Sequence, residues 1–265
     1  MPVAAFVVLV MVTVGAFFIV QHLKVSTPLV AGRPAPAPST INPVSAGVCA
    51  IRNGKGMLTK MSFRRAKVSF YLINRADDVD VYIVDDDGEI VRTLPGSGRY
   101  LKTFTRRTFV WNGREDDGRV APDGAYDIQV FLVHQARTLL IRNSVSGAIE
   151  PITVDTVPPH PVVTSVSPDR ITASSPKAVT IRYSGTDRLR PQILIYRIGP
   201  AGPRQVKRYA ATSRAGASLW DGTIGGRPAS AGTYVVAVAL TNKACTTGKS
   251  PATVAAAPHA VVTVT

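Results

Sequence analysis

The sequence has few cysteines, few aromatic residues and few charged residues. Of 265 residues two are cysteine, 7% are aromatic and 18% are charged. Two cysteines are too few for a disulfide-dense mini-protein, and 20 prolines exclude a long coiled coil. A single long apolar run excludes a polytopic membrane protein. Because 45% of the residues are hydrophobic, the chain is folded and can form one large domain or two of about 100 residues.

Acidic residues are scarce relative to basic ones. Lysine and arginine total 31 against 17 aspartates and glutamates, which gives a net charge of +14. A basic surface can dock on an anionic cell-wall polymer or another envelope component, and it can equally be a plain solvated surface. No aromatic platform lies among the arginines, so we expect no nucleic-acid binding. The local clusters of cations are Arg64, Arg65, Lys67, Arg106, Arg107, Arg188 and Arg190.

The one long apolar run extends from Val3 to Val20, and no basic side chain precedes it. Eighteen helical residues span about 27 Å, close to the thickness of a bilayer core. A cleavable signal peptide needs a basic start and a small-residue cleavage site, which are lacking here. We therefore predict an uncleaved single-pass transmembrane anchor at residues 1–24, followed by a Pro/Ala-rich linker at residues 25–45 that favours polyproline II.

The orientation of this anchor has two conflicting indicators. Lys24 and Arg33 follow the run, and the positive-inside rule taken alone places the body in the cytoplasm. The pattern of the body is instead typical of an extracellular β domain. We expect the body on the extracellular side of the cytoplasmic membrane.

Beyond residue 45 the apolar residues alternate with period two, and turn residues separate the stretches. The turns include Asp87-Gly88, Pro95–Gly98 and Gly199–Gly202. Many short strands with regular turns predict an all-β antiparallel sandwich. The alternating sets are Val68, Phe70 and Leu72; Val79, Val81 and Ile83; Tyr126, Ile128, Val130 and Leu132; Val179 and Ile181; Ile193 and Ile195; and Tyr234, Val236, Val238 and Leu240.

One motif occurs twice, built around the two tryptophans of the chain. Each copy has a Trp, a following Asn-Gly or Asp-Gly, a mid-loop Gly, and a Gly-x-Tyr; Trp and Tyr are 15 residues apart in the first copy and 14 in the second. The motif predicts a hairpin with both aromatic rings in the core. The motif residues are Trp111, Gly113, Gly118, Gly124, Tyr126, Trp220, Gly222, Gly226, Gly232 and Tyr234.

This duplication predicts two tandem immunoglobulin-like β-sandwiches, at residues 46–157 and 158–265, because each copy has the size of such a domain. The proline-rich link at residues 157–161 marks the boundary, since three prolines in five residues cannot lie in a central strand.

On these residues the sequence resembles the immunoglobulin-like domain of the flagellar hook-capping protein, which is also found in many secreted bacterial proteins. The ending Asp155-Thr156-Val157-Pro158 follows the same pattern. The second copy has a shorter loop and lacks the acidic residues of 115–117. The resemblance covers roughly residues 60–265 and implies the fold. It does not imply hook capping, because that activity needs a region this chain replaces with its predicted anchor.

The remaining candidate sites have simpler interpretations. The acidic turns at residues 85–89 and 115–117 lack the ligand spacing of a calcium loop, so we expect solvated turns. His22, His134, His160 and His259 show no metal or catalytic spacing, so we expect no catalytic residues, metal or cofactor. Cys49 and Cys245 lie 196 residues apart; outside the membrane they either pair or remain two separate, partly buried thiols.

The sequence thus favours a non-enzymatic, membrane-anchored binding or scaffolding module of a bacterial cell surface. A second hypothesis is that the chain is the stalk of a larger surface enzyme whose catalytic domain lies outside it. A third, a flagellar or secretion accessory, is disfavoured because the hook-binding region is missing.

Overall fold

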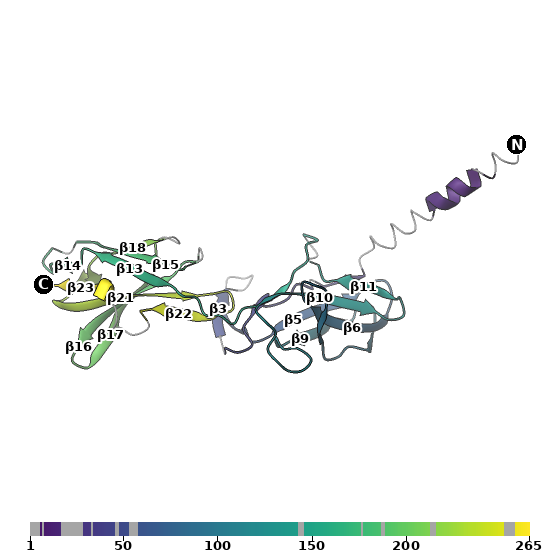
Figure 1. Ribbon diagram of the computed structural model, residues 1–265, viewed down its shortest axis with the longest axis horizontal. Helices are drawn as coiled ribbons and strands as arrows, with labels where there is room; N and C mark the ends of the chain where they lie inside the picture. Colours follow the sequence, from purple (N-terminus) through teal and green to yellow (C-terminus); the bar gives the residue numbers. More distant parts are fainter. Residues whose placement is uncertain are drawn as a thin grey trace. The chain divides into compact units, whose positions relative to one another are not determined.

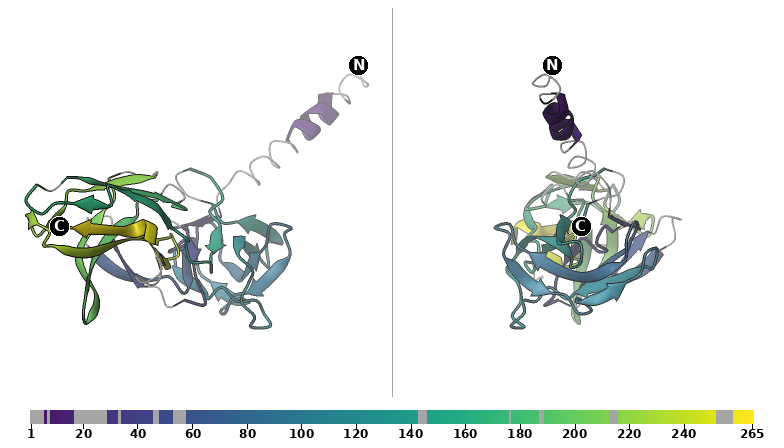
Figure 2. Two further views of the ribbon diagram at one scale, coloured as in Figure 1. Left: turned by 60° about the vertical axis from the view of Figure 1, so that its left-hand side comes forward. Right: turned by 90° about the vertical axis from the view of Figure 1, so that its right-hand side faces the viewer.

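The chain is all-β in the part that the structure, a computed structural model, describes (Figures 1 and 2). The described residues are 6, 8–16, 29–32, 34–45, 48–52, 58–142, 146–175, 177–186, 189–212, 216–251 and 258–265. Helical residues occur at 8–16 and in the short 3-10 helix η2 (Pro258–Ala260). Strands in several sheets make up most of the rest, consistent with the predicted immunoglobulin-like architecture.

The strands before residue 157 form two main sheets. The smaller has the order β1-β5-β9, and the larger has the order β2-β12-β10-β6-β7, with β8 on β6 and β11 on β10. Their bounds are β1 (Val30–Ala31), β2 (Thr40–Ile41), β5 (Ala66–Leu72), β6 (Asp77–Val84), β7 (Ile90–Thr93), β8 (Arg99–Leu101), β9 (Arg107–Trp111), β10 (Gly124–Leu132), β11 (Arg137–Leu140) and β12 (Ile152–Val154).

The strands after residue 161 repeat this arrangement. One sheet has the order β13-β15-β18, and the other has the order β14-β23-β21-β16-β17, with β22 on β21. Figure 1 shows β13, β15 and β18 together on one side of this set and β16, β17 and β22 on the other. Their bounds are β13 (Val162–Ser167), β14 (Arg170–Ile171), β15 (Val179–Ser184), β16 (Gln192–Gly199), β17 (Gly202–Ala210), β18 (Ala217–Trp220), β21 (Gly232–Thr241), β22 (Thr247–Ser250) and β23 (Val261–Val264).

Each set contains the same unusual parallel contact in an otherwise antiparallel fold. A two-residue strand pairs in parallel with the last strand of its set: β2 with β12, and β14 with β23. Two short hairpins complete the description, β3 (Val48–Arg52) with β4 (Leu58–Ser62), and β19 (Thr223–Ile224) with β20 (Arg227–Pro228).

Contacts divide the chain into two compact units. The first comprises residues 1–39, 67–111 and 125–152, and the second comprises residues 40–66, 112–124 and 153–265. The predicted domain boundaries at residues 46–157 and 158–265 remain a prediction.

The predicted alternation is confirmed at every named position. All residues of the alternating sets are at most 5% exposed. In β16 and β21, however, the intervening residues Leu194, Val235 and Ala237 are buried as well. Strands β5 and β6 show the pattern most clearly, with buried residues at every second position. The pleat places these side chains on one face, where they form the core.

The predicted membrane anchor falls largely outside the described residues, which leave out 1–5, 7 and 17–28. In the described part of the chain, no helix has the length and apolar character needed to cross a bilayer.

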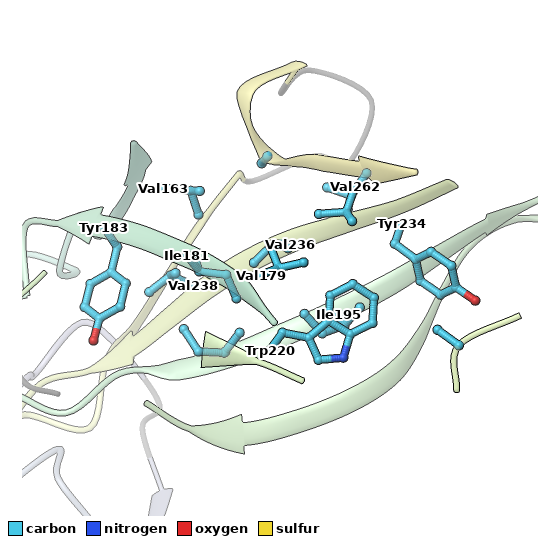
Figure 3. Close-up of a cluster of buried hydrophobic side chains, with 14 of the residues drawn as sticks. Val163, Val179, Ile181, Tyr183, Ile195, Trp220, Tyr234, Val236, Val238 and Val262 are labelled. Atoms are coloured by element: carbon cyan, nitrogen blue, oxygen red, sulfur yellow. The ribbon is translucent and has the colours of Figure 1, made fainter. Parts of the chain in front are cut away.

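The two tryptophans end strands, as predicted, and each packs against the tyrosine of its own motif. The predicted hairpin is wrong, because the Trp strand and the Tyr strand of each motif lie in different sheets, β9 and β10 in one case and β18 and β21 in the other. The ring centroids of Trp111 and Tyr126 are 5.1 Å apart, and those of Trp220 and Tyr234 are 5.6 Å apart. In the second core, drawn in Figure 3, Trp220 and Tyr234 have no exposed surface. The Tyr234 hydroxyl donates to the Ser230 carbonyl (2.8 Å), the contact that defines a tyrosine corner.

A buried carboxylate organises the turn between β10 and β11. Asp77 is 0% exposed and accepts hydrogen bonds from the backbone N–H groups of His134 (2.8 Å) and Gln135 (3.1 Å) and from the Gln135 side chain (2.9 Å). Burial opposes ionisation, but these hydrogen bonds outweigh it and hold the pKa of the Asp77 carboxyl below its ordinary value of 3.8.

We expect Trp220→Ala to lower the free energy of unfolding by about 3–5 kcal/mol, because it leaves a cavity in the second core. Leu219→Ala is the matched control, since Leu219 is the neighbouring residue of β18 and is 55% exposed. Its effect should stay within about 0.5 kcal/mol. Urea unfolding followed by near-ultraviolet circular dichroism measures both. Equal losses for the two variants would contradict the placement of Trp220.

We expect Asp77→Asn to lower the free energy of unfolding at neutral pH by roughly 1–3 kcal/mol, because the buried amide replaces a charged acceptor. The pKa of Asp77 is lowered in the folded chain, so its contribution is present above pH 3.8 and is lost as the pH falls through the folded value. The difference in unfolding free energy between Asp77→Asn and the unmodified protein should therefore become smaller below about pH 3.8, as measured by unfolding curves at several pH values. Asp86→Asn, in an exposed turn, is the control. If this difference in unfolding free energy does not change with pH, Asp77 is not ionised in the folded chain.

Candidate functional site

The glycines of the repeated motif occupy the turn positions predicted for them. Gly113 (φ +69°) and Gly222 (φ +71°) follow the tryptophan strands in the left-handed region. A Cβ atom at Gly113 would lie 2.9 Å from Pro43, so the site also lacks room for a side chain. The remaining motif glycines fit the prediction as well: Gly118 and Gly226 have positive φ, and Gly124 and Gly232 begin β10 and β21.

The structure joins the two cysteines in a disulfide. The Cα atoms of Cys49 and Cys245 are 5.9 Å apart, so of the two alternatives left by the sequence the paired state is present. Cys49 lies on β3, and Cys245 lies in the turn between β21 and β22 with a φ of +61°. Both belong to the second contact unit, because residues 40–66 group with residues 153–265. The chain separation of the pair gives no clue to this proximity.

Side-chain amides hold the same turn, at residues 242–246. The Asn42 amide nitrogen donates to the Thr246 hydroxyl (3.1 Å) in a buried contact. The Asn242 amide nitrogen donates to the Asp155 carboxylate (2.9 Å), while its oxygen accepts from the Thr246 N–H (2.8 Å). Sequence reasoning did not identify the Asn42–Thr246 and Asn242–Asp155 contacts, since the partners of each are distant in the chain.

A cavity of about 390 Å³ adjoins this turn, between Asp155, the proline-rich link and Asn242. Burial, together with the charge of Asp123, raises the pKa of the Asp155 carboxyl. The link packs closely on glycine backbone: a Cβ at Gly248 would lie 1.6 Å from the Pro159 carbonyl oxygen. The lining residues are Asp155, Val157, Pro158, Pro159, His160, Gly185, Leu189, Leu240 and Asn242.

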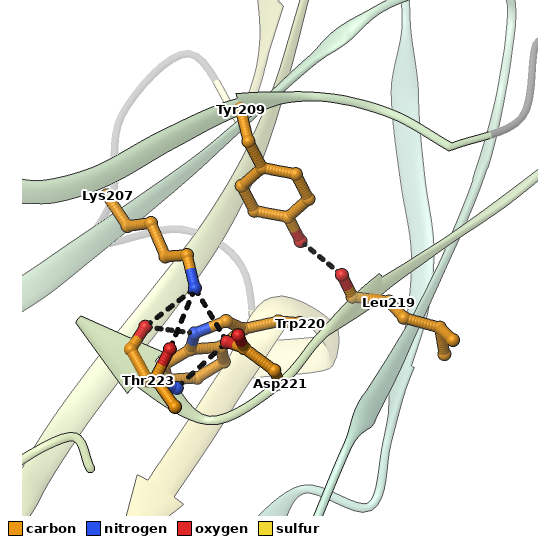
Figure 4. A network of polar contacts seen from close by, with 6 residues as sticks. All are labelled: Lys207, Tyr209, Leu219, Trp220, Asp221 and Thr223. Atoms are coloured by element: carbon orange, nitrogen blue, oxygen red, sulfur yellow. Dashed lines mark hydrogen bonds and ion pairs between the residues drawn. The ribbon is translucent and has the colours of Figure 1, made fainter. Parts of the chain in front are cut away.

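A lysine missed by the sequence reasoning secures the second motif turn (Figure 4). The ammonium of Lys207, on β17, donates to the Asp221 carboxylate (2.6 Å) and to the Thr223 carbonyl (2.8 Å). Burial alone would favour protonated Asp221, but the bonds from Lys207 and Thr223 lower the pKa of its carboxyl. The Trp220 indole N–H also donates to the Thr223 carbonyl (3.0 Å). The network is structural, because every polar group in it is directed at the turn.

The acidic turns are exposed and internally hydrogen bonded. The Asp85 carboxylate accepts from the Glu89 N–H (2.8 Å), and Asp117 pairs with Arg119. Among the described residues, no group of three or more His, Cys, Asp and Glu side chains is arranged to hold a metal ion. His134 contacts Asp77, His160 lines the cavity, His259 lies in η2, and His22 lies outside the described residues.

Five predicted cations flank the small sheet β1-β5-β9. Arg64, Arg65 and Lys67 are exposed at the beginning of β5. Arg106 is exposed before β9, and Arg107 begins that strand with its Nη1 buried. Of the other two, Arg190 is exposed and Arg188 lies outside the described residues. These exposed cations make the beginning of β5 positively charged, and such a surface attracts anions.

An exposed aromatic pair lies at the other end of β5. The Phe104 ring is 71% exposed and its centroid is 5.9 Å from that of Tyr71. Phe104 has a φ of +55°, a conformation that costs a non-glycine residue of order 1–3 kcal/mol. Sequence reasoning missed the pair, because neither residue is part of an alternating set.

No curated protein matches the chain. Among solved structures it is similar to dimeric latent PorU from Porphyromonas gingivalis, with 12% identity over 76% of this chain and 18% of that chain and a TM-score of 0.30. For a marsupial T cell receptor the identity is 14% over 69% of this chain and 65% of that chain, with a TM-score of 0.30. The chain thus spans less than two thirds of either protein.

A complex of Dpr2 Ig1-Ig2 with DIP-Theta Ig1-Ig3 gives 15% identity over 76% of this chain and 91% of that chain, with a TM-score of 0.22. TM-scores this low carry no argument about the fold or the function of the chain.

A comparison with protein families finds a match for the segment that contains the first Trp–Tyr motif. The profile of the FlgD Ig-like domain matches residues 59–134, a range that includes both Trp111 and Tyr126. The match does not extend to the second motif. The predicted resemblance is therefore confirmed for this segment: residues 59–134 match the flagellar hook-capping type of bacterial immunoglobulin-like domain.

Proposed function

We propose that the protein is a non-enzymatic binding or scaffolding module of a bacterial envelope. In this proposal residues 3–20 cross the cytoplasmic membrane once, and the body lies on the extracellular side as two tandem immunoglobulin-like sandwiches. The ligand is an anionic envelope component, such as a cell-wall polymer. The observation that carries the binding role is the group of exposed cations at the beginning of β5.

The repeated strand order supports the two sandwiches. The order β1-β5-β9 matches β13-β15-β18, and β2-β12-β10-β6-β7 matches β14-β23-β21-β16-β17. The short parallel strand recurs at the same place in each set. A Trp–Tyr contact is present in each set as well. Equivalent positions of so many features are expected of a duplicated domain.

The surface of the helical segment supports the anchor. Leu9, Met11 and Val12 are 64%, 67% and 63% exposed. With 3.6 residues per turn, these three side chains point in different directions around the helix. A helix that is apolar all round is unfavourable in water and favourable in a bilayer. Residues 8–16 therefore have the surface that a membrane-embedded segment requires.

The charge and position of the β5 cations support the binding role. Arg64, Arg65 and Lys67 are exposed, and none of these side chains forms an ion pair within the described part of the chain. Unpaired surface cations attract polyanions over about 8–10 Å at physiological ionic strength.

We expect the full chain, in detergent, to bind isolated cell envelope with an affinity that falls as salt is raised. The double variant Arg65→Gln/Lys67→Gln should bind less than Arg99→Gln/Lys243→Gln, which removes the same charge from exposed positions elsewhere. The fraction of protein that sediments with the envelope, measured across a salt series, gives the binding of each variant. Absence of binding at low salt, or equal loss in both double variants, would contradict the proposal.

We expect protease added to intact cells to digest the body of the protein, because the proposal places residues 46–265 outside. Loop tips such as residues 85–89 are exposed sites for cleavage. A cytoplasmic marker protein must stay intact in the same cells. If the body is protected until the membrane is opened, the orientation is wrong.

A further inference from the structure

A cationic aromatic patch lies where the chain enters the first sandwich. We define it as Tyr71, Lys102, Phe104 and Arg106. Lys102 and Arg106 are exposed, and Tyr71 and Phe104 have their ring centroids 5.9 Å apart. A Cβ at Gly32, directly after β1, would lie 3.0 Å from the Tyr71 ring and 3.2 Å from Arg106 Nη2. The patch therefore adjoins the first described strand.

Folding alone does not account for Phe104. Its ring is 71% exposed, so it contributes little apolar burial. Its φ of +55° suits glycine or asparagine better than a bulky residue. The backbone enforces this conformation, because the Phe104 N–H donates to the Leu72 carbonyl (2.9 Å) and the Thr105 N–H donates to the Lys102 carbonyl (3.3 Å). The turn thus presents an aromatic ring to the outside at a conformational cost.

The composition of the patch is that of a surface that meets a membrane interface. Exposed aromatic rings flanked by lysine and arginine are found where proteins meet the membrane interface. The ring enters the headgroup region, while the cations pair with anionic headgroups. Lys102 and Arg106 flank Phe104 at two residues on either side, which gives this arrangement within one turn.

The course of the chain brings the patch to such a surface. Strand β1 pairs with the end of β5 through Val30↔Leu72 and Ala31↔Tyr71. The apolar run ends at Val20 and β1 begins at Val30, so the nine residues 21–29 connect them. Fully extended, the ten steps from Val20 to Val30 reach at most about 36 Å. A membrane that holds the run therefore lies within reach of the patch.

We propose that this patch contacts the anionic headgroups of the membrane in which residues 3–20 are anchored, and so fixes the first sandwich at the bilayer surface. The inference rests on the anchor of the proposed function. It assigns to the anchored body a lipid contact that is separate from the cations at the beginning of β5.

The test uses the full chain reconstituted into phosphatidylcholine vesicles with brominated acyl chains, with or without phosphatidylglycerol. Phe104→Trp places a fluorophore in the patch, and Tyr100→Trp places one at a 58% exposed position on β8 of the other sheet. The unmodified protein supplies the background of its two buried tryptophans. We expect a blue shift and quenching for Phe104→Trp in phosphatidylglycerol vesicles, and neither for Tyr100→Trp.

Two outcomes separate this inference from the proposed function. If the chain floats with vesicles and resists carbonate extraction, but both tryptophan variants behave alike, the anchor stands and the patch contact is overturned. If the chain neither floats nor resists carbonate, the anchor is wrong and the patch contact falls with it.

Two substitutions distinguish lipid contact from a structural role. In the Phe104→Trp background, Arg106→Gln should reduce the dependence of quenching on phosphatidylglycerol, whereas Arg99→Gln should not. Separately, Phe104→Asn should keep or raise the thermal midpoint, since asparagine tolerates positive φ. A marked drop in that midpoint would mean that Phe104 serves folding, and would overturn the inference.

Discussion

The burial of the Trp220 indole is the constraint on which the second core depends. An indole N–H inside a core must find an acceptor, because burying it unpaired costs several kcal/mol. The Thr223 carbonyl is that acceptor, and it lies there because the chain reverses at Gly222 with a φ of +71°. Lys207 then binds the same carbonyl and the Asp221 carboxylate, so the neighbouring strand β17 holds the turn in place. Tryptophan, turn and lysine thus form one unit.

Much of this unit could be predicted from the sequence, because its residues are close in the chain. The spacing of Trp, Gly and Tyr predicted the strand end, the turn and the buried tyrosine, and these are found at Trp220, Gly222 and Tyr234. The predicted hairpin is wrong, because β18 and β21 belong to different sheets and a local spacing does not record which sheet a strand joins. Period-two alternation likewise predicted the named core positions, since alternation is a local property of a pleated strand. It missed Leu194, Val235 and Ala237, which lie between those positions and are buried as well. Lys207 was missed, because nothing in a run of exposed polar residues indicates which one faces a distant turn.

Contacts between distant segments are where the sequence reasoning reaches its limit. The turn at residues 242–246 receives a disulfide from Cys49 and hydrogen bonds involving Asn42 and Asp155. The disulfide partners are 196 residues apart in the sequence. A crosslink over such a loop lowers the conformational entropy of the unfolded chain, which stabilises the folded state by about 5 kcal/mol in the chain-entropy model. Such a pairing depends on three-dimensional proximity alone, which residue types and spacing do not record. Phe104 was missed for a related reason, since a backbone conformation of that kind has no sequence signature in a bulky residue.

The two candidate binding features share one strand, and its geometry determines what each can bind. Lys67 and Tyr71 both project from the outer face of β5, as residues four positions apart do in a strand, and so lie about 13 Å apart. That separation is larger than the Debye length of about 8 Å at physiological ionic strength, so charges at the two ends act nearly independently. The Tyr71 end adjoins β1, through which the chain arrives from the apolar run. In our proposal, the Lys67 end, farther from this entry along β5, is left for a ligand other than the lipid assigned to the patch. A polyanion bound near Lys67 would therefore interact mainly with the cations at the beginning of β5 and little with those of the patch. Salt and substitutions can then change membrane contact and ligand binding separately.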